Sequence, residues 1–224
     1  MGKKKDKIQA PMGETKVLLH TCCAPCSSAI IEAMLQNGIT PVIYYCNPNI
    51  YPYDEYLIRK NECTRYAESL GLEIIDDDYD HEGWLQAVKG MENEPERGGR
   101  CLKCFKIRLL RTAEYAASHG IKVITTTLAS SRWKSLDQIN EAGRWACWKV
   151  AGGLSTPLEM TEGELEMTEG ELEMTAAPVW WDQNWRKGGL QERRLQIIKE
   201  YDFYNQLYCG CEFSMRKEGQ STGD

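Results

Sequence analysis

The cysteines are the residues whose types and spacing most clearly predict chemistry. An iron–sulfur cluster takes four thiolates, which would leave about three thiols for a second metal or a redox-active dithiol. A structural zinc usually takes two pairs of C-x₂₋₄-C type, which accounts for fewer thiols than the sequence groups together. Seven of the ten cysteines form three groups: Cys22-Cys23-x-x-Cys26, Cys101-x-x-Cys104 and Cys209-x-Cys211. The other three, Cys46, Cys63 and Cys147, are interpreted as buried small hydrophobic residues.

Basic residues surround the second cysteine pair. Six lie between positions 97 and 111 without an acidic residue among them: Arg97, Arg100, Lys103, Lys106, Arg108 and Arg111. A solvated helix face normally mixes the two signs of charge, so this segment predicts a surface that contacts phosphates. Arg132, Lys134, Arg186 and Lys187 are candidates to extend that surface.

Tryptophans accompany these basic residues. Trp133, Trp181 and Trp185 could each stack on an unpaired RNA base. The group at 180, 181 and 185 fits a small core cluster equally well. Both interpretations stay open at the level of the sequence.

The elements that must position these residues alternate between strands and helices. Short β-rich runs at 16–20, 41–46, 72–76 and 122–127 predict strands, and the segments 29–37, 54–70, 104–119 and 190–206 predict helices. This order predicts an α/β fold with a parallel sheet and helices on its faces. Ligands of such sheets bind outside the carboxyl ends of the strands, and the loop of Cys22 lies at such an end. Helix-terminal amides there would favour thiolates.

Length and composition fit one medium domain. The 224 residues are 42% hydrophobic, and no apolar run approaches the ~20 residues that span a bilayer. The lysines near the N-terminus precede no apolar segment, so we expect a cytoplasmic protein with reduced thiols. The predicted organisation is a basic arm at 1–15, one α/β metalloenzyme domain at 16–216 and a polar tail at 217–224.

An acidic repeat interrupts this domain at about 151–178. Leu-Glu-Met-Thr-Glu-Gly-Glu occurs at 158–164 and 165–171 and begins again at 172–175. Its glycines each cost ~1 kcal/mol of helix propensity, so we expect an acidic loop instead of a coiled coil. The repeat holds seven of the 33 acidic residues and no basic residue. The net charge of −6 therefore does not argue against a polyanionic partner.

Taken together, the motifs resemble the QueH-type epoxyqueuosine reductases, which are cobalamin-independent. The resemblance covers roughly residues 15–149 and 179–216. The matching pieces are Leu19-His20-Thr21-Cys22-Cys23-Ala24-Pro25-Cys26-Ser27, Tyr45-Cys46-Asn47-Pro48-Asn49-Ile50, Glu55-Tyr56 with Arg59, Gly99-Arg100-Cys101-x-x-Cys104-x-x-x-Arg108, Thr125-Thr126-Thr127-Leu128 with Ser131 and Lys134, and Lys187-Gly188-Gly189 through Tyr204-x-Gln206-x-Tyr208-Cys209-Gly210-Cys211-Glu212-Phe213-Ser214.

The resemblance implies a Rossmann-like sheet of the HUP/PP-loop type with a helical C-terminal part. It implies two-electron deoxygenation of epoxyqueuosine to queuosine at the wobble position of tRNA. A 4Fe-4S cluster would be held by Cys22, Cys23, Cys101 and Cys104. Cys209 and Cys211 would form a redox-active pair, with a disulfide in the oxidised form, or bind an adjacent metal. Cys26 is the candidate for contact with a second, mononuclear iron.

The remaining assignments concern the proton, the RNA and the electrons. His20 is a candidate proton donor, although a histidine at the end of a buried strand also fits a hydrogen-bonded core role. The candidate tRNA-binding residues are Arg100, Lys106, Arg108, Lys134, Arg186 and Lys187. Without a G-x-G-x-x-G fingerprint, we expect the electron donor to be a small protein such as ferredoxin or flavodoxin. We expect no membrane partner.

Two alternatives remain open. A cluster-dependent tRNA sulfur transferase could use the same scaffold, but it would require an ATP site. The sequence has Cys-Cys-Ala-Pro-Cys-Ser where a phosphate-binding turn would follow the first strand. The other alternative is a zinc-stabilised RNA-binding module in which every grouped thiol is structural.

Overall fold

A parallel sheet forms the centre of the protein. The computed structural model describes residues 8–153 and 177–215, and in these residues five strands pair in the order β3-β2-β1-β4-β5. All neighbouring strands are parallel. The strands are β1 at Lys16–His20, β2 at Thr40–Tyr45, β3 at Ile74–Asp76, β4 at Val123–Thr126 and β5 at Val179–Trp180.

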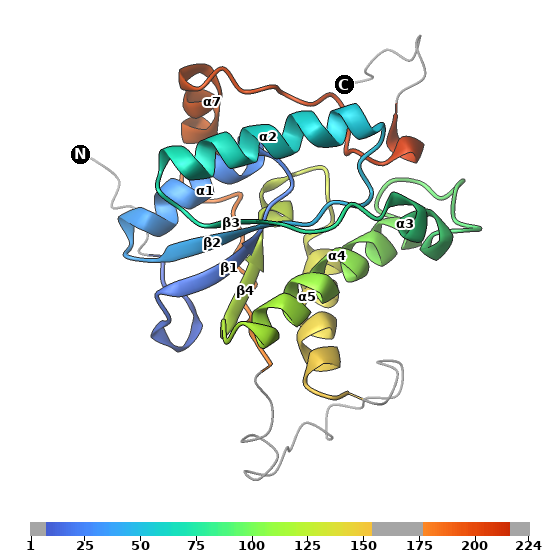
Figure 1. The fold of residues 1–224 in the computed structure, drawn as a ribbon, viewed down its shortest axis with the longest axis horizontal. Coiled ribbons are helices and arrows are strands. Elements are labelled where there is room, and N and C mark those ends of the chain that lie inside the picture. The colour runs from blue at the N-terminus through green and yellow to red at the C-terminus, as the bar shows by residue number, and fades with distance from the viewer. Residues whose placement is uncertain (1–7, 154–176, 216–224) are drawn as a thin grey trace.

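Helices cover both faces of this sheet. Helices α1, α2 and α7 lie on one face, and α4 and α5 lie on the other (Figure 1). The helices are α1 at Ala24–Gln36, α2 at Tyr53–Ser69, α3 at His81–Ala87, α4 at Gly99–Ser118, α5 at Leu136–Val150 and α7 at Leu190–Glu200. The predicted α/β, Rossmann-like architecture is confirmed.

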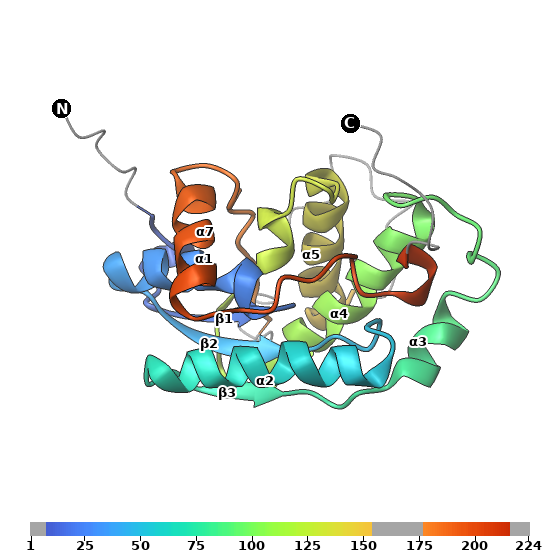
Figure 2. The same cartoon turned by 90° about the horizontal axis from the view of Figure 1, so that it is seen from above.

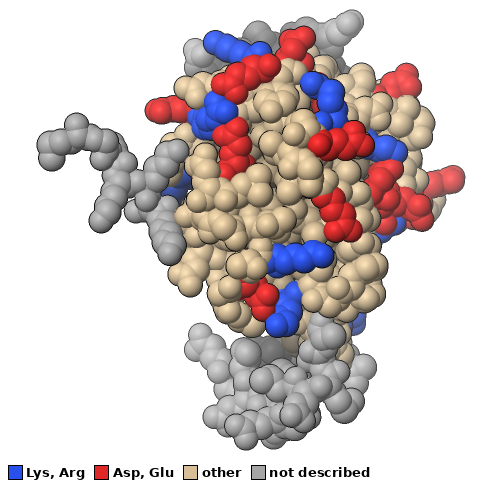
Figure 3. All heavy atoms as spheres, turned by 60° about the vertical axis from the view of Figure 1, so that its left-hand side comes forward, with Lys and Arg blue, Asp and Glu red and all other residues tan. Residues whose placement is uncertain are grey.

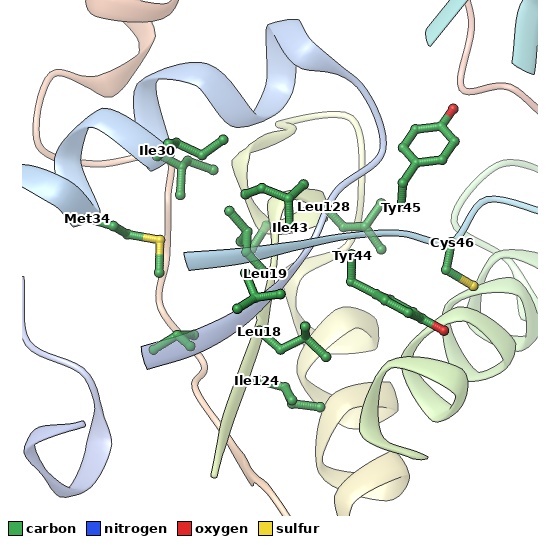
Figure 4. Close-up of a cluster of buried hydrophobic side chains, with 14 of the residues drawn as sticks. Leu18, Leu19, Ile30, Met34, Ile43, Tyr44, Tyr45, Cys46, Ile124 and Leu128 are labelled. Atoms are coloured by element: carbon green, nitrogen blue, oxygen red, sulfur yellow. The ribbon is translucent and has the colours of Figure 1, made fainter. Parts of the chain in front are cut away.

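The core lies between these layers and contains the central strands. Val17, Leu18 and Leu19 of β1 are 0% exposed, as expected for a strand that is covered on both faces. Figure 4 shows Leu19 beside Ile43 of β2 and Leu18 beside Ile124 of β4. The register agrees, because Leu19 pairs with Ile43 and Leu18 with Ile124.

The chain reverses its direction of travel across the sheet between β1 and β4. It proceeds from β1 to β2 and β3 on one side, and β4 and β5 then lie on the other side of β1. The crevice outside the carboxyl ends of two such strands is where open α/β sheets bind their ligands. The loop of Cys22 follows β1, and a 3-10 turn at Thr127–Ser130 follows β4. Both border this switch point.

Three helix boundaries differ from their predicted positions by five residues or more. Helix α1 begins at Ala24, not at residue 29, because Pro25 is well suited to the first turn of a helix. Helix α4 begins at Gly99, so Cys101 and Cys104 lie on its first turns. Helix α7 ends at Glu200, and the chain continues to Gln206 without helical structure.

The segment that precedes β1 packs against the domain. The backbone N–H of Ile8 donates a hydrogen bond to Asn37, and Ala10 is buried. The described part of the predicted arm is therefore not fully solvated. Residues 1–7, the acidic repeat at 158–174 and the tail at 217–224 lie outside the described residues. Within the described ranges, none of the helices combines the length and apolar character needed to cross a bilayer.

Helix α5 approaches β5 closely at Gly143. A Cβ atom at this position would lie 2.2 Å from Cδ2 of Trp180. We expect Gly143→Ala to lower the free energy of unfolding by about 1–3 kcal/mol, because overpacking a filled core forces shifts of side chains and backbone. Urea denaturation measures this change. Arg144→Ala, on the exposed side of the same helix, should change it by less than about 0.5 kcal/mol, and equal effects of the two variants would contradict the packing argument.

Candidate metal centre

Three thiols converge where β1 leads into α1. The Sγ atoms of Cys22, Cys23 and Cys26 all lie within 4.8 Å of one another, and those of Cys22 and Cys23 are 3.8 Å apart. Cys23 is the N-cap of α1, and Cys26 lies on its first turn. The positive end of the helix dipole is therefore directed at the thiols, which favours their charged form.

Two residues from distant parts of the chain contact these sulfurs. Thr127, which follows β4, donates its hydroxyl to Cys22 Sγ at 3.5 Å and accepts the Cys22 N–H at 3.3 Å. The side-chain amide of Gln206 donates to Cys23 Sγ at 3.0 Å and lies 3.6 Å from Cys26 Sγ. The three-thiol group is thus held by β1, β4 and the segment after α7.

The other four grouped cysteines form a neighbouring set. Cys101 and Cys104 lie one turn apart on α4. Negative charge on Cys209 and Cys211 contributes to raising the pKa of both thiols. Cys104 and Cys211 also share a small buried cluster with Trp84 and Val88. Burial raises the pKa of the Cys104 thiol to about 11. All ten cysteines are free thiols in this structure.

Two cations border both groups of thiols. Arg108 is 2% exposed, and its guanidinium donates to the Cys46 carbonyl and the Asn47 side chain, which are both neutral. Its charge acts on Cys104, Cys22 and Cys209. The Lys134 ammonium acts on Cys209, Cys22 and Cys26. Within residues 8–153 and 177–215, neither cation forms an ion pair with a carboxylate.

The cations and hydrogen bonds give the thiols of Cys22, Cys23 and Cys26 different pKa values. Hydrogen bonds from Cys23 and Cys26, followed by the charges of Lys134 and Arg108, hold the pKa of Cys22 well below its usual range. Burial raises the pKa of Cys23 well above its usual value. The interaction with Cys22 raises the pKa of Cys26 to about 12. Without a metal, the favoured state is therefore one thiolate at Cys22 beside two thiols.

His20 lies beneath this site with both ring nitrogens engaged. Nδ1 is 2.7 Å from Thr126 Oγ1, and Nε2 is 3.0 Å from the Cys46 carbonyl oxygen, which can only accept. Burial, together with the charge of Arg108, lowers the pKa of His20 to about 3. The imidazole is therefore neutral and bound in the core. This arrangement favours the structural interpretation of His20 over the proton-donor assignment, because the ring cannot hold a transferable second proton near neutral pH.

The C-terminal cysteines are positioned by a buried ion pair on α2. Arg59 is 2% exposed and pairs with Glu55. It also donates to the carbonyl oxygens of Tyr208 and Cys209 at 3.3 and 3.2 Å. Figure 2 shows this segment running from α7 across the molecule to α3. A Cβ at Gly210 would lie 3.0 Å from Arg59, and its φ of 122° further disfavours other residues.

The basic residues expected to bind RNA do not form one continuous surface. Arg100 and Arg108 are each 2% exposed, so their predicted phosphate contact is at odds with this structure. Arg100 donates to backbone carbonyls at 91, 92 and 94. Lys106 pairs with Glu141 at 2.8 Å. Arg186 donates to the Lys134 carbonyl, while Lys187 is exposed.

Charge patterning on one face also argues against an extended basic groove there. Figure 3 shows basic and acidic side chains interspersed around an uncharged area. Among the tryptophans, Trp181 and Trp185 are buried and pack edge to face at 5.2 Å, which supports the core interpretation for both. Trp133 is 67% exposed.

Comparison with known proteins decides the family. A sequence model described as "Epoxyqueuosine reductase QueH" matches residues 17–153 and 157–217. The chain belongs to the QueH family. A relative from Haemophilus influenzae, named epoxyqueuosine reductase QueH, is 44% identical over 212 residues, covering 95% of this chain and 76% of its own.

Other relatives with the same printed name extend the QueH comparison. The protein from Acinetobacter baylyi is 42% identical over 216 residues, covering 96% of this chain and 88% of its own. The protein from Thermotoga maritima is 29% identical over 202 residues, covering 89% and 90%.

The residues of this QueH family member fit a thiolate-bound metal group. The donor set is sulfur, which suits iron–sulfur clusters and zinc. The buried Arg108 requires negative charge nearby, because a buried ion without a counter-charge is strongly unfavourable. Thiolates that bind a metal would provide such charge. The site therefore fits a metal group bound by cysteine sulfur.

Roles for three residues of this QueH site do not follow from the sequence alone. Thr127, Gln206 and Arg59 all occur in the motifs that carry the resemblance, but only the fold brings Gln206 to Cys23, 183 positions away. The signal available in the sequence was that each of the three is a polar residue within a motif piece.

The unequal protonation predicts a reactivity order in metal-free, reduced protein. Near pH 7, iodoacetamide should modify Cys22 more than about tenfold faster than Cys26, because each pKa unit changes the thiolate fraction tenfold. As pH rises, the rate at Cys22 should reach its plateau at a lower pH than the rate of an ordinary thiol. Lys134→Met should shift its midpoint upward, since the ammonium favours the thiolate.

Mass spectrometry of the alkylated peptides measures these rates. Cys147, whose pKa burial raises to about 12, serves as the internal reference. Equal rates at Cys22 and Cys147 near pH 7 would contradict the assignment of the thiolate to Cys22.

Proposed function

We propose that this QueH family member reduces epoxyqueuosine in tRNA to queuosine. Both C–O bonds of the epoxide break, a C=C bond forms, and two electrons and two protons convert the oxygen to water. The observation that carries the proposal is the group formed by Cys22, Cys23 and Cys26 at the switch point of the sheet, next to two cations that also interact with Cys104 and Cys209. The family model and the relatives named epoxyqueuosine reductase support the same reaction.

Cys22, Cys23, Cys101 and Cys104 would hold a 4Fe-4S cluster, which supplies electrons one at a time. Cys26 would contact a second, mononuclear iron. Cys209 and Cys211 would provide a redox-active dithiol or bind that adjacent metal. Thiols of both sets interact electrostatically with Arg108 and Lys134, which supports placing one centre near these cations.

Lys134 is suited to stabilise the negative charge that develops on the epoxide oxygen as it leaves. Neighbouring thiol charges outweigh burial and raise the pKa of its ammonium, so Nζ stays protonated while negative charge develops nearby. A fixed cation that meets developing charge lowers the barrier to bond cleavage. Arg108 instead keeps its guanidinium on Cys46 and Asn47, and its role is to balance the charge of the thiolates.

The tRNA would approach from the side of Lys134. Lys103, Arg132 and Lys187 are exposed basic residues on the segments that flank this side chain. Their contacts to phosphates would provide affinity without sequence preference. The electrons would come from a small protein such as ferredoxin or flavodoxin.

Cysteine substitution tests the metal assignment. Protein purified without oxygen should contain iron and acid-labile sulfide near four each per chain, with additional iron if the second site is filled. Cys101→Ser should lose most of the sulfide and the reduction of epoxyqueuosine in tRNA. Cys147→Ser, on α5, should retain both.

Elemental analysis, sulfide assay and electron paramagnetic resonance after reduction make the measurement. Zinc without sulfide in the wild-type protein would instead favour the RNA-binding alternative. A fully active Cys101→Ser protein would refute the ligand set.

Salt dependence tests the RNA contacts. The double variant Lys103→Ala/Lys187→Ala should bind tRNA more weakly and reduce the slope of log K against log salt by about 1–2, because each lost phosphate contact removes about 0.7–0.9. Lys122→Ala serves as the control, since Lys122 is already paired with Glu14. An unchanged slope in the double variant would place the RNA elsewhere.

A further inference from the structure

The exposed Trp133 is held in place by its surroundings. Its side chain is 67% exposed, whereas Trp84, Trp181 and Trp185 are buried. Arg97 donates to the carbonyl oxygens of Arg132 and Trp133 at 3.0 and 2.9 Å. The N–H of Trp133 donates to Ser131 Oγ at 3.3 Å. These bonds fix the backbone that carries the indole, so it is presented to solvent from an ordered turn.

Two arginines lie near this indole. The Arg132 guanidinium lies over one face of the ring, 5.0 Å from its centre, and Arg97, which precedes α4, holds the same turn. In the described part of the chain, neither arginine forms an ion pair with a carboxylate. The opposite face of this exposed indole, together with cations that have no carboxylate partner, is the combination that binds an unpaired base and its phosphates.

The same turn leads directly to the metal centre. Lys134 is the next residue, about 3.8 Å away between Cα atoms, and its ammonium acts on Cys209, Cys22 and Cys26. Arg186, in the loop after β5, donates to the Lys134 carbonyl at 2.7 Å. The turn is therefore held from both sides, with the indole at its exposed end and the ammonium at its thiol end.

We infer that Trp133 is a stacking platform for an unpaired nucleobase next to the nucleoside that reacts at the thiol centre. The inference rests on the proposed function and specifies how the substrate is held. Stacking on Trp133 would draw a flanking base out of the loop of the RNA, while Arg97 and Arg132 neutralise the adjoining phosphates. The reacting nucleoside would then lie toward Lys134.

The experiment compares Trp133→Ala and Trp133→Phe with the wild-type protein loaded with its metal. The probes are an RNA hairpin with an unpaired loop and a fully paired RNA duplex of equal length. Trp133→Ala should weaken hairpin binding about tenfold, and Trp133→Phe should retain affinity within about threefold, because stacking needs only an aromatic face. Affinity for the duplex should not change.

Leu195→Ala is the matched control, because Leu195 is a 57% exposed apolar residue on α7. It should leave affinity for both RNAs unchanged. A second readout is fluorescence: the hairpin should quench the tryptophan emission of the wild-type protein, and Trp133→Phe should remove part of that quenching. Metal content of each variant confirms that the centre is intact.

Equal hairpin affinity of Trp133→Ala and wild-type protein would overturn the platform while leaving the proposed reduction standing. Loss of electron delivery from a donor protein, with hairpin affinity unchanged, would also overturn it and assign the indole to a protein interface. If the wild-type protein reduces no epoxyqueuosine but shows the predicted differences in RNA affinity, the platform stands and the proposed reaction falls.

Discussion

The positive charge buried at the carboxyl end of the sheet is the constraint on which the site depends. Transfer of a cation out of water costs several kcal/mol unless an opposite charge compensates it. Arg108 obtains only neutral oxygens from Cys46 and Asn47. The thiols must therefore supply negative charge. The dependence is mutual, because neighbouring thiolates repel one another and need cations to coexist.

The topology of the sheet explains why such different parts of the chain can share this charge balance. The strands β1 and β4 are adjacent and parallel, so the loops that follow them begin at the same edge. Helix α1 starts there with Cys23 as its N-cap, and Thr127 follows β4. Arg108 reaches the same place from the middle of α4. The segment after α7 then covers the thiols with Gln206.

Much of this arrangement can be predicted from local sequence. The strand at 16–20 is recognisable because its apolar run is bounded by turn residues, and the cysteine groups are visible from their spacing. The burial of Arg100 and Arg108 is harder to predict, because a count of charges does not reveal which face of a helix they occupy. Their spacing around Cys104 contained the missing information, since positions 100, 104 and 108 lie on one face. The contact between Gln206 and Cys23 requires the tertiary fold.

The contact between Gln206 and Cys23 also has a consequence for biosynthesis. The two residues are separated by 183 positions, and ribosomes add about 5–20 residues per second. Roughly 10 to 40 s therefore pass between the synthesis of the first thiols and that of the amide that covers them. During this interval β1 and α1 can form with three cysteines uncovered. The complete set of thiols with its covering amide is a late product of translation, and a metal group held by the finished set would be inserted after it.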